Sequence, residues 1–187
     1  LDDDYVKFVR LAESLIEKND EGVVGMITSH GYIDNPTFRG MRWHLRKTFD
    51  AIYVLDLHGN SNKKEVSPDG GKDENVFNIK TGVSIMLGVK KGNKGKNGKL
   101  AEVYKADLFG SREDKFEKLD TSKLANISWT KLSDKSDVWY LEGEGKDEYK
   151  KGFSVADLFS HNTTGIVTMG DSFIVDMDKE ALIRRVQ

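Results

Sequence analysis

Residues 50–91 have the sequence DAIYVLDLHGNSNKKEVSPDGGKDENVFNIKTGVSIMLGVKK, in which two apolar runs flank a long polar loop. The run at residues 51–57 is continuous, as is typical of a strand buried on both faces. A second strand is expected from about residue 82 to residue 89. It follows without an intervening helix, so it can run antiparallel to the first. Phe77 stands where the loop enters this strand, and it is either an ordinary core residue or an aromatic surface offered to a flat ligand.

The residues before this stretch predict a strand–helix–strand unit. Residues 5–18 carry apolar side chains at helical spacing, and residues 23–28 are typical of a short buried strand. Asn35 followed by Pro36 predicts a helix over residues 36–48, because Asn is a good N-cap and Pro suits the first helical position. Continuous apolar strands joined by a helix are typical of a parallel pair buried between helix layers.

The pattern is weaker beyond residue 100. We expect a strand at residues 101–108, a charged helix near residues 112–119, a strand near residues 138–141 and a final helix at residues 178–186. A doubly wound domain normally begins with a strand and a Gly-rich turn, whereas this chain begins with a helix. The expected fold class is therefore α/β, as the back half of such a sheet followed by a smaller α+β portion.

Composition excludes several classes of protein. The chain has 187 residues, a net charge of −2 and no cysteine. A disulfide framework and thiolate metal sites are excluded, and a reducing cytoplasm is the expected location. No apolar run approaches the ~20 residues that cross a bilayer. Because the chain is not a polycation, any contact with nucleic acid must come from local basic clusters.

Three short motifs do not predict a catalytic or metal site. In the Gly/Lys stretch at residues 92–99 the spacing and the following Leu100 do not match a phosphate loop. The four histidines lack metal-ligand spacing. His58 near Asp56 and Ser61 could be drawn as a catalytic triad, but polar residues after a strand are usually a loop.

Basic residues form small clusters that have two interpretations. Three arginines lie near one face of the helix predicted at residues 36–48, and two Lys pairs occupy loops. Each cluster is either a solvated face or a set of phosphate contacts that positions nucleic acid. The candidate DNA-contact residues are Arg39, Arg42, Arg46, Lys63, Lys64, Lys90 and Lys91.

The segment from Tyr5 to Phe77 resembles the region that follows the catalytic Asn-Pro-Pro-Tyr motif of adenine-specific DNA methyltransferases. The similar subgroup is the large single-chain restriction–modification enzymes called type IIG and type ISP. The stretches NPTFRGMR, YVLDLHGN and PDGGKDENVF carry most of the resemblance. It continues through AEVYKADLFGSREDKFEKL and reappears in TTGIVTMGDSF, which resembles the approach to a target-recognition domain. NPTF itself is not the catalytic motif, because Asn35 is explained as a helix cap.

The resemblance implies a partial Rossmann-like methyltransferase sheet. Residues 1–99 would be the C-terminal half of the catalytic domain, and residues 100–187 a connector and the start of the target-recognition region. The third strand would insert between the first two, antiparallel to both. The Gly-rich turn and the catalytic residues would lie upstream of Leu1, and the cofactor would be S-adenosylmethionine.

The resemblance also implies site residues. The family's aromatic at the start of the last core strand stacks on a flipped adenine, and this position falls on Phe77. The family's aromatic in the first helix after the catalytic motif approaches the cofactor, and it falls on Phe8, with Tyr5 as the weaker match. No catalytic residue and no metal ligand is expected within the chain itself.

The expected function is part of a DNA adenine-N6 methyltransferase that is inactive without the rest of its polypeptide. Its partners would be double-stranded DNA and that polypeptide, and the exposed sheet edge of the fragment would promote self-association. One alternative is a non-catalytic module that positions DNA through its Arg helix and Lys loops. A small-molecule α/β enzyme is a third hypothesis, without a recognisable site.

Overall fold

The computed structural model divides the chain into two compact units, Leu1–Glu142 and Gly143–Gln187. The predicted strand near residues 138–141 lies outside the described residues except for Trp139, and the stretch TTGIVTMGDSF lies outside them entirely. The structure describes residues 3–92, 99–133, 139, 151–153, 155–159, 161 and 176–186.

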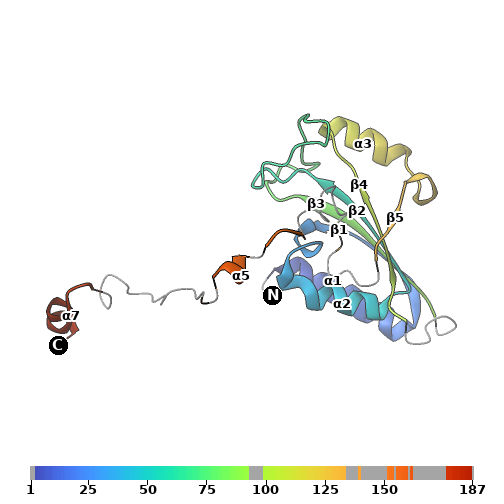
Figure 1. Cartoon of the computed structure of the whole chain (residues 1–187). Coiled ribbons are helices and arrows are strands. Elements are labelled where there is room, and N and C mark those ends of the chain that lie inside the picture. Colours follow the sequence, from blue (N-terminus) through green and yellow to red (C-terminus); the bar gives the residue numbers. More distant parts are fainter. Residues whose placement is uncertain are drawn as a thin grey trace. The chain divides into compact units, whose positions relative to one another are not determined.

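The first unit contains a mixed sheet with the strand order β1-β3-β2-β4-β5 (Figure 1). β3 runs antiparallel to both β1 and β2, and β2 runs parallel to β4. The insertion of the third strand between the first two is therefore confirmed. The strands are β1 Glu21–Ser29, β2 Ala51–His58, β3 Val83–Lys91, β4 Glu102–Asp107 and β5 Thr130–Lys131.

β4 lies in the same sheet as β1, β2 and β3, although it comes from the segment that we assigned to the connector. It pairs with β2 from Ala51 opposite Glu102 to Asp56 opposite Asp107. The division of roles at residue 99 stays a prediction. What the fold shows is an α/β unit in which residues on both sides of that division share one sheet.

The helices agree with the sequence patterns to within one or two residues, except that the second begins as a 3-10 turn. Asn35 caps this turn, since its side-chain oxygen accepts a hydrogen bond from the backbone of Thr37 at 2.9 Å. The α-helices are α1 Asp4–Asn19, α2 Arg39–Thr48, α3 Arg112–Thr121, α5 Val155–Leu158 and α7 Lys179–Val186. The 3-10 turns are η1 His30–Tyr32, η2 Pro36–Phe38 and η3 Leu124–Asn126. Within the described part of the chain, every helix is too short or too polar to cross a bilayer.

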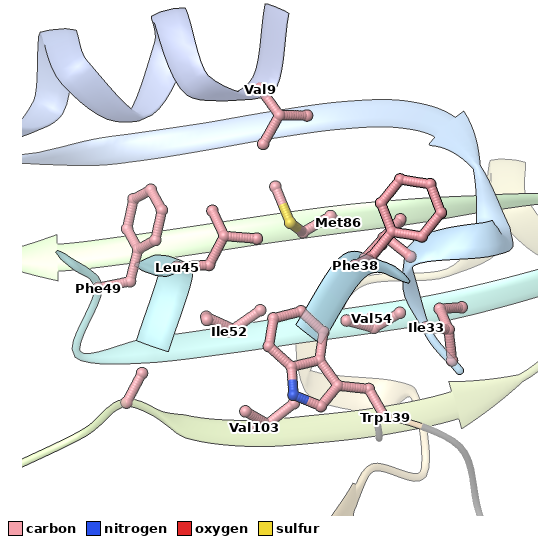
Figure 2. Packing of buried hydrophobic residues seen from close by; sticks show 12 residues of the cluster. Val9, Ile33, Phe38, Leu45, Phe49, Ile52, Val54, Met86, Val103 and Trp139 are labelled. Atoms are coloured by element: carbon pink, nitrogen blue, oxygen red, sulfur yellow. The ribbon is translucent and has the colours of Figure 1, made fainter. Parts of the chain in front are cut away.

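Two hydrophobic clusters cover opposite faces of the sheet. Figure 2 shows the larger one, in which Val9 of α1 and Leu45 of α2 pack with Ile52 and Val54 of β2. The smaller cluster includes Leu55 and the other side chains that alternate to the opposite face. It consists of Leu55, Leu57, Val76, Val83 and Ala106, with Leu119 of α3 packed against it.

The sheet has one edge with exposed apolar side chains, which we call the β1 edge. Among the described strands, β1 pairs with β3 alone. Val23 and Ile27 of β1 are 66% and 45% exposed. Val23 and Ile27 project from the face of the smaller cluster, whereas α1 covers the other face. The β1 edge comprises these two residues and the exposed Phe8, Leu11 and Leu15 of α1.

Candidate functional site

The carboxyl ends of β1, β2 and β4 lie at one end of the sheet, which we call the carboxyl rim. Because β3 is antiparallel, its amino end reaches the same rim. Val83 at that end pairs with Ser29 of β1 and with His58 of β2, and Asp56 pairs with Asp107 of β4. Ligands of open α/β sheets bind outside the carboxyl ends of the strands. The rim is therefore the first place to look for a site.

The loop of residues 59–82 joins β2 to β3 at this rim, and Asn75 fixes its geometry. The amide nitrogen of Asn75 donates to the carbonyls of Gly59, at 3.2 Å, and Thr81, at 2.8 Å. Gly59 has a φ of +76°, and a Cβ there would lie 2.4 Å from the Asn75 Cα. Only glycine fits at this close approach. The two ends of the loop are thus held together.

Phe77 projects from this loop with its side chain partly in solvent. It is 43% exposed, whereas the preceding Val76 is 5% exposed and packs in the smaller cluster. The backbone nitrogen of Phe77 donates to Asn75 Oδ1 at 2.9 Å. Of the two interpretations of Phe77, an ordinary core residue does not agree with this exposure. Stacking on a base stays a prediction.

Helix α3 is bound to the loop through Arg112. The guanidinium of Arg112 donates from Nε to the carbonyl of Asn75, at 2.8 Å, and from Nη2 to the carbonyl of Phe77, at 3.0 Å. The backbone nitrogen of Arg112 donates to Glu74 Oε2 at 3.1 Å. The four loop residues from Glu74 to Phe77 are therefore bound to the start of α3.

Lys115, one turn further along α3, makes a second and fully buried set of contacts. Its ammonium donates to the carbonyls of Leu57, at 2.7 Å, and Glu74, at 2.6 Å, and lies 2.7 Å from Asp73 Oδ1. Both charged side chains are completely buried. Asp73 also accepts hydrogen bonds from the backbone of Gly59 and of Gly110. This ion pair joins β2, the loop and α3.

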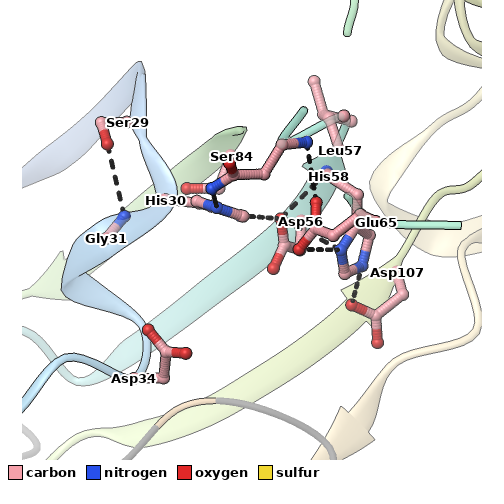
Figure 3. Close-up of polar contacts among 12 residues, drawn as sticks. Ser29, His30, Gly31, Asp34, Asp56, Leu57, His58, Glu65, Ser84 and Asp107 are labelled. Atoms are coloured by element: carbon pink, nitrogen blue, oxygen red, sulfur yellow. Dashed lines mark hydrogen bonds and ion pairs between the residues drawn. The ribbon is translucent and has the colours of Figure 1, made fainter. Parts of the chain in front are cut away.

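A buried charged network lies at the carboxyl rim (Figure 3). His30 Nδ1 lies 3.0 Å from Asp56 Oδ1, and its Nε2 lies 3.0 Å from the amide nitrogen of Asn60. With Nδ1 donating to Asp56, Nε2 can accept from that amide. His58 Nε2 lies 2.8 Å from Asp107 Oδ1. The ammonium of Lys105, which is 1% exposed, contacts both Asp56 and Asp107.

This network shifts the pKa values of its members. Burial alone would raise the pKa of Asp56, but the hydrogen bond with His30 and the charge of Lys105 outweigh it and lower the pKa to about 2. Burial alone would lower the pKa of His58, but hydrogen bonds with Asp107 and Glu65 raise it to about 9. His58 is therefore protonated and Asp56 ionised at neutral pH.

The network also brings metal-ligand side chains together. His30, His58 and Glu65 form one group with ligand atoms within 4.8 Å, and Asp56, His58 and Asp107 form another. These ligand atoms already have other partners, however. Both histidine rings contact carboxylates, and the Lys105 ammonium contacts both Asp56 and Asp107. At the second group a divalent ion would have to displace that ammonium, and at the first it would have to compete with the carboxylates that the two rings contact. The arrangement fits a structural charge network better than a metal centre.

The sequence did not predict this network. From the sequence we interpreted Asp56 and His58 as polar residues of a loop, and we assigned His30 to no site. Their proximity depends on the pairing of β1, β2 and β4, which the local pattern does not give. One signal was available. His30 and His58 follow two strands that were expected to be parallel, so the two histidines should lie near the same end of the sheet.

The two residues predicted to approach a cofactor lie on α1 with different environments. Phe8 is 60% exposed. Tyr5 is half-buried and packs on Phe38 with ring centroids 6.0 Å apart. Its hydroxyl is buried without a hydrogen-bond partner among the described residues, and burial, with a contribution from Asp3, raises its pKa. A Cβ at Gly31 would lie 3.9 Å from this hydroxyl, so Tyr5 lies next to the carboxyl end of β1.

The predicted arginine face needs a correction, because two of its three members are buried. Arg42 is 3% exposed and its Nη1 donates to the carbonyls of Tyr32, at 2.7 Å, and Asn35, at 3.0 Å. Arg46 is 8% exposed and its Nε donates to the carbonyl of Ala101 at 3.3 Å. These side chains hold loops in place and do not form a solvated face. Arg39 is exposed.

The two Lys pairs lie at opposite ends of the sheet. Lys63 and Lys64 are exposed in the rim loop, and Lys63 lies 3.4 Å from Asp34. Lys90 and Lys91 lie at the far end of the nine-residue β3, where Lys90 pairs with Asp20 at 3.2 Å. Eight residues of strand correspond to roughly 26 Å. One small surface therefore cannot contain both pairs, and contact with DNA by either stays a prediction.

The fold of this chain is similar to segments of restriction–modification enzymes solved on DNA. The ATP-dependent Type ISP restriction-modification enzyme LlaBIII, bound to DNA, is 28% identical over 77% of this chain and 10% of that one, with a TM-score of 0.61. A nuclease-deletion mutant of the Type ISP enzyme LlaGI, in complex with a DNA substrate mimic, is 27% identical over 71% of this chain and 12% of that one, with a TM-score of 0.57.

The DrdV–DNA complex shows the same fold over more of the chain. It covers 97% of this chain and 19% of its own, with 24% identity and a TM-score of 0.65. This chain thus spans between 10% and 19% of the length of these proteins. No protein-family model and no curated protein matches the sequence. The chain therefore resembles part of DNA-bound restriction–modification enzymes.

Proposed function

We propose that this chain supplies part of the target-base pocket of a DNA adenine-N6 methyltransferase in a restriction–modification system. Residues 1–99 would be the back half of its catalytic domain, and residues 100–187 a connector toward target recognition. The observation that carries the proposal is the exposed aromatic Phe77 on a loop braced at the carboxyl rim. The likeness to DNA-bound enzymes of this class supports it.

Phe77 has the chemistry that a flipped base requires. A base that leaves the duplex loses stacking worth a few kcal/mol and is then held against flat side chains. An aromatic side chain that is half in solvent and attached to a fixed backbone offers such a surface without reorganisation. Base–aromatic stacking contributes ~1–3 kcal/mol. The catalytic Asn-Pro-Pro-Tyr motif would come from the remainder of the polypeptide.

S-adenosylmethionine would supply the methyl group, and two residues of α1 fit a cofactor of this kind. The exposed ring of Phe8 offers a flat surface for an adenine ring. The Tyr5 hydroxyl is a buried polar group without a partner among the described residues, so a ligand hydroxyl or amine could satisfy it. Both residues belong to the proposed cofactor pocket.

Substitution of Phe77 in the full-length enzyme tests the proposal. Phe77→Ala should leave the melting temperature nearly unchanged and slow methylation by about 5- to 150-fold, which corresponds to ~1–3 kcal/mol of lost stacking. Ile79→Ala is the matched control, because Ile79 is a similarly exposed apolar residue of the same loop. Equal methylation rates for the two variants would contradict the proposal.

The second candidate function is a module that positions DNA without catalysis. Exposed Arg39 on α2 and exposed Lys63 and Lys64 on the rim loop favour it. Binding of the chain to duplex DNA at increasing salt concentration distinguishes the two. A positioning module that uses Z phosphates should give a slope of about −0.9Z in log K against log salt. A half-domain that depends on its parent should bind DNA weakly and self-associate through the β1 edge in sedimentation experiments.

A further inference from the structure

The segment Asn75–Phe77 is held by the side chain of one residue that is 35 positions away from Phe77 in the sequence. We propose that Arg112 is a positioning residue for the target base, which acts by fixing the backbone that carries Phe77. This inference rests on the proposed function of Phe77. Arg112 itself would touch neither the base nor the cofactor.

The geometry of the guanidinium supports this role. Its Nε and Nη2 donate to two carbonyls that flank Val76, one from Asn75 and one from Phe77. A planar fork with fixed donors can hold two acceptors at once, which an ammonium does less well. Val76 between them is buried in the smaller cluster. Its backbone is therefore fixed on both sides, and the Phe77 ring is left partly exposed.

Arg112 is itself held rigidly at the start of α3. Ser111 caps this helix, since its hydroxyl oxygen accepts a hydrogen bond from the backbone of Asp114 at 3.1 Å. The backbone of Arg112 donates to Glu74, and Lys115 on the same helix donates to the Glu74 carbonyl. Residues three apart lie on one side of a helix, so Arg112 and Lys115 face the loop together.

The contacts couple two parts of the chain that we expect to have different roles. Phe77 belongs to the segment proposed for the base pocket, and Arg112 to the segment proposed for the connector toward target recognition. Two hydrogen bonds from Arg112 link them directly. A displacement of α3 would therefore move the backbone of Phe77. The position of the stacking aromatic would follow the position of the connector.

The test compares Arg112→Ala, Arg112→Lys and Phe77→Ala in the full-length enzyme. The measured signals are the kcat of methylation and the fluorescence of 2-aminopurine placed at the target adenine. Arg112→Ala should reduce kcat by about five- to thirtyfold, as expected for the loss of one to two net hydrogen bonds, and should change the fluorescence in the same direction as Phe77→Ala does. Arg112→Lys should resemble Arg112→Ala, because Lys keeps the charge but not the fork. Lys118→Ala, on an exposed position of α3, is the matched control.

The double variant Phe77→Ala/Arg112→Ala separates positioning from general stability. If Arg112 acts through Phe77, removal of Arg112 should have no further effect once the ring is gone. Additive losses would overturn the inference, and so would full activity in Arg112→Ala or in Arg112→Lys. If Phe77→Ala itself has no effect, the proposed function fails, whereas a defect in Phe77→Ala alone overturns only the inference. Amide exchange at Phe77 and Asn78 in the 187-residue chain should quicken in both Arg112 variants, and unchanged exchange would also overturn it.

Discussion

The two lateral ends of the sheet, the β1 edge and the part around β4, differ in how much of their apolar surface is buried. At the β1 edge, apolar side chains of β1 and α1 lie in solvent, with Phe8, Leu11 and Val23 each more than half exposed. On the β4 side, Val103 and Ala106 are buried and α3 is fixed to the rim loop by Arg112 and Lys115. The β4 side is more completely covered, although Phe116 of α3 is 51% exposed, and the β1 edge has the larger share of exposed apolar side chains.

This difference shows that the buried polar contacts between distant residues are concentrated on the β4 side. The β4 side contains a fully buried ion pair and a loop fixed by hydrogen bonds from distant residues. The β1 edge contains unpaired strand backbone among the described strands and apolar area without cover. Buried charged contacts are concentrated on the β4 side, and exposed apolar side chains at the β1 edge.

The largest effect on the β4 side should come from Lys115→Met. The variant leaves the carboxylate of Asp73 and two backbone carbonyls without their ammonium partner. Removal of one member of a buried ion pair typically costs about 3–5 kcal/mol. Chemical denaturation would measure the free energy of unfolding. Lys118→Met, on the exposed side of the same helix, should change it by no more than about 0.5 kcal/mol. Similar free energies of unfolding for the two variants would show that the buried ion pair does not stabilise the β4 side.

A pair of identical substitutions compares the two sides directly. Val103→Ala on β4 removes a side chain that is 4% exposed, and Val23→Ala on β1 removes one that is 66% exposed. The first should lower the free energy of unfolding by about 1.5–3 kcal/mol, and the second by no more than about 0.5 kcal/mol. Thermal or denaturant unfolding at concentrations low enough to keep the chain monomeric measures both. A cost above about 1 kcal/mol for Val23→Ala would mean that the β1 edge is already covered in solution.

A further effect should come from pH, and it should be concentrated at the rim. The pKa of His58 is raised from 6.5 to about 9, so the protonated ring stabilises the fold fully below pH 6.5. That contribution should be lost as the pH rises from 6.5 through 9. His58→Gln should abolish this alkaline loss. Amide exchange should report faster opening in the rim loop and not in α1, and uniform opening would contradict the assignment to the rim.

Local patterns predicted the helices and strands well but not the way in which distant residues meet. The apolar runs at residues 51–57 and 82–89 became β2 and β3, and the cap at Asn35 is where we expected it. Helical spacing correctly placed the arginines on α2. It could not show that the carbonyls of Tyr32 and Ala101 would surround Arg42 and Arg46, because those contacts depend on packing.

The candidate site was predictable only in part for the same reason. The position of Phe77 at the strand entrance was visible in the sequence, and the resemblance gave it a role. The residues that hold it, Asn75 and Arg112, were not identified, because their partners are set by loop closure and by α3. The order β1-β3-β2 came from the resemblance, whereas the sequence pattern alone indicated only an antiparallel pair.

The insertion of β3 between β1 and β2 also determines when this sheet can form during synthesis. The first two strands do not pair with each other, and each pairs with residues 83–91. While only residues 1–82 have left the ribosome, β1 therefore has no sheet neighbour within this unit. Pairing across so many residues is slow, and apolar strands without partners expose the nascent chain to aggregation. The emergence of this middle strand thus sets the earliest moment at which β1 and β2 can join one sheet.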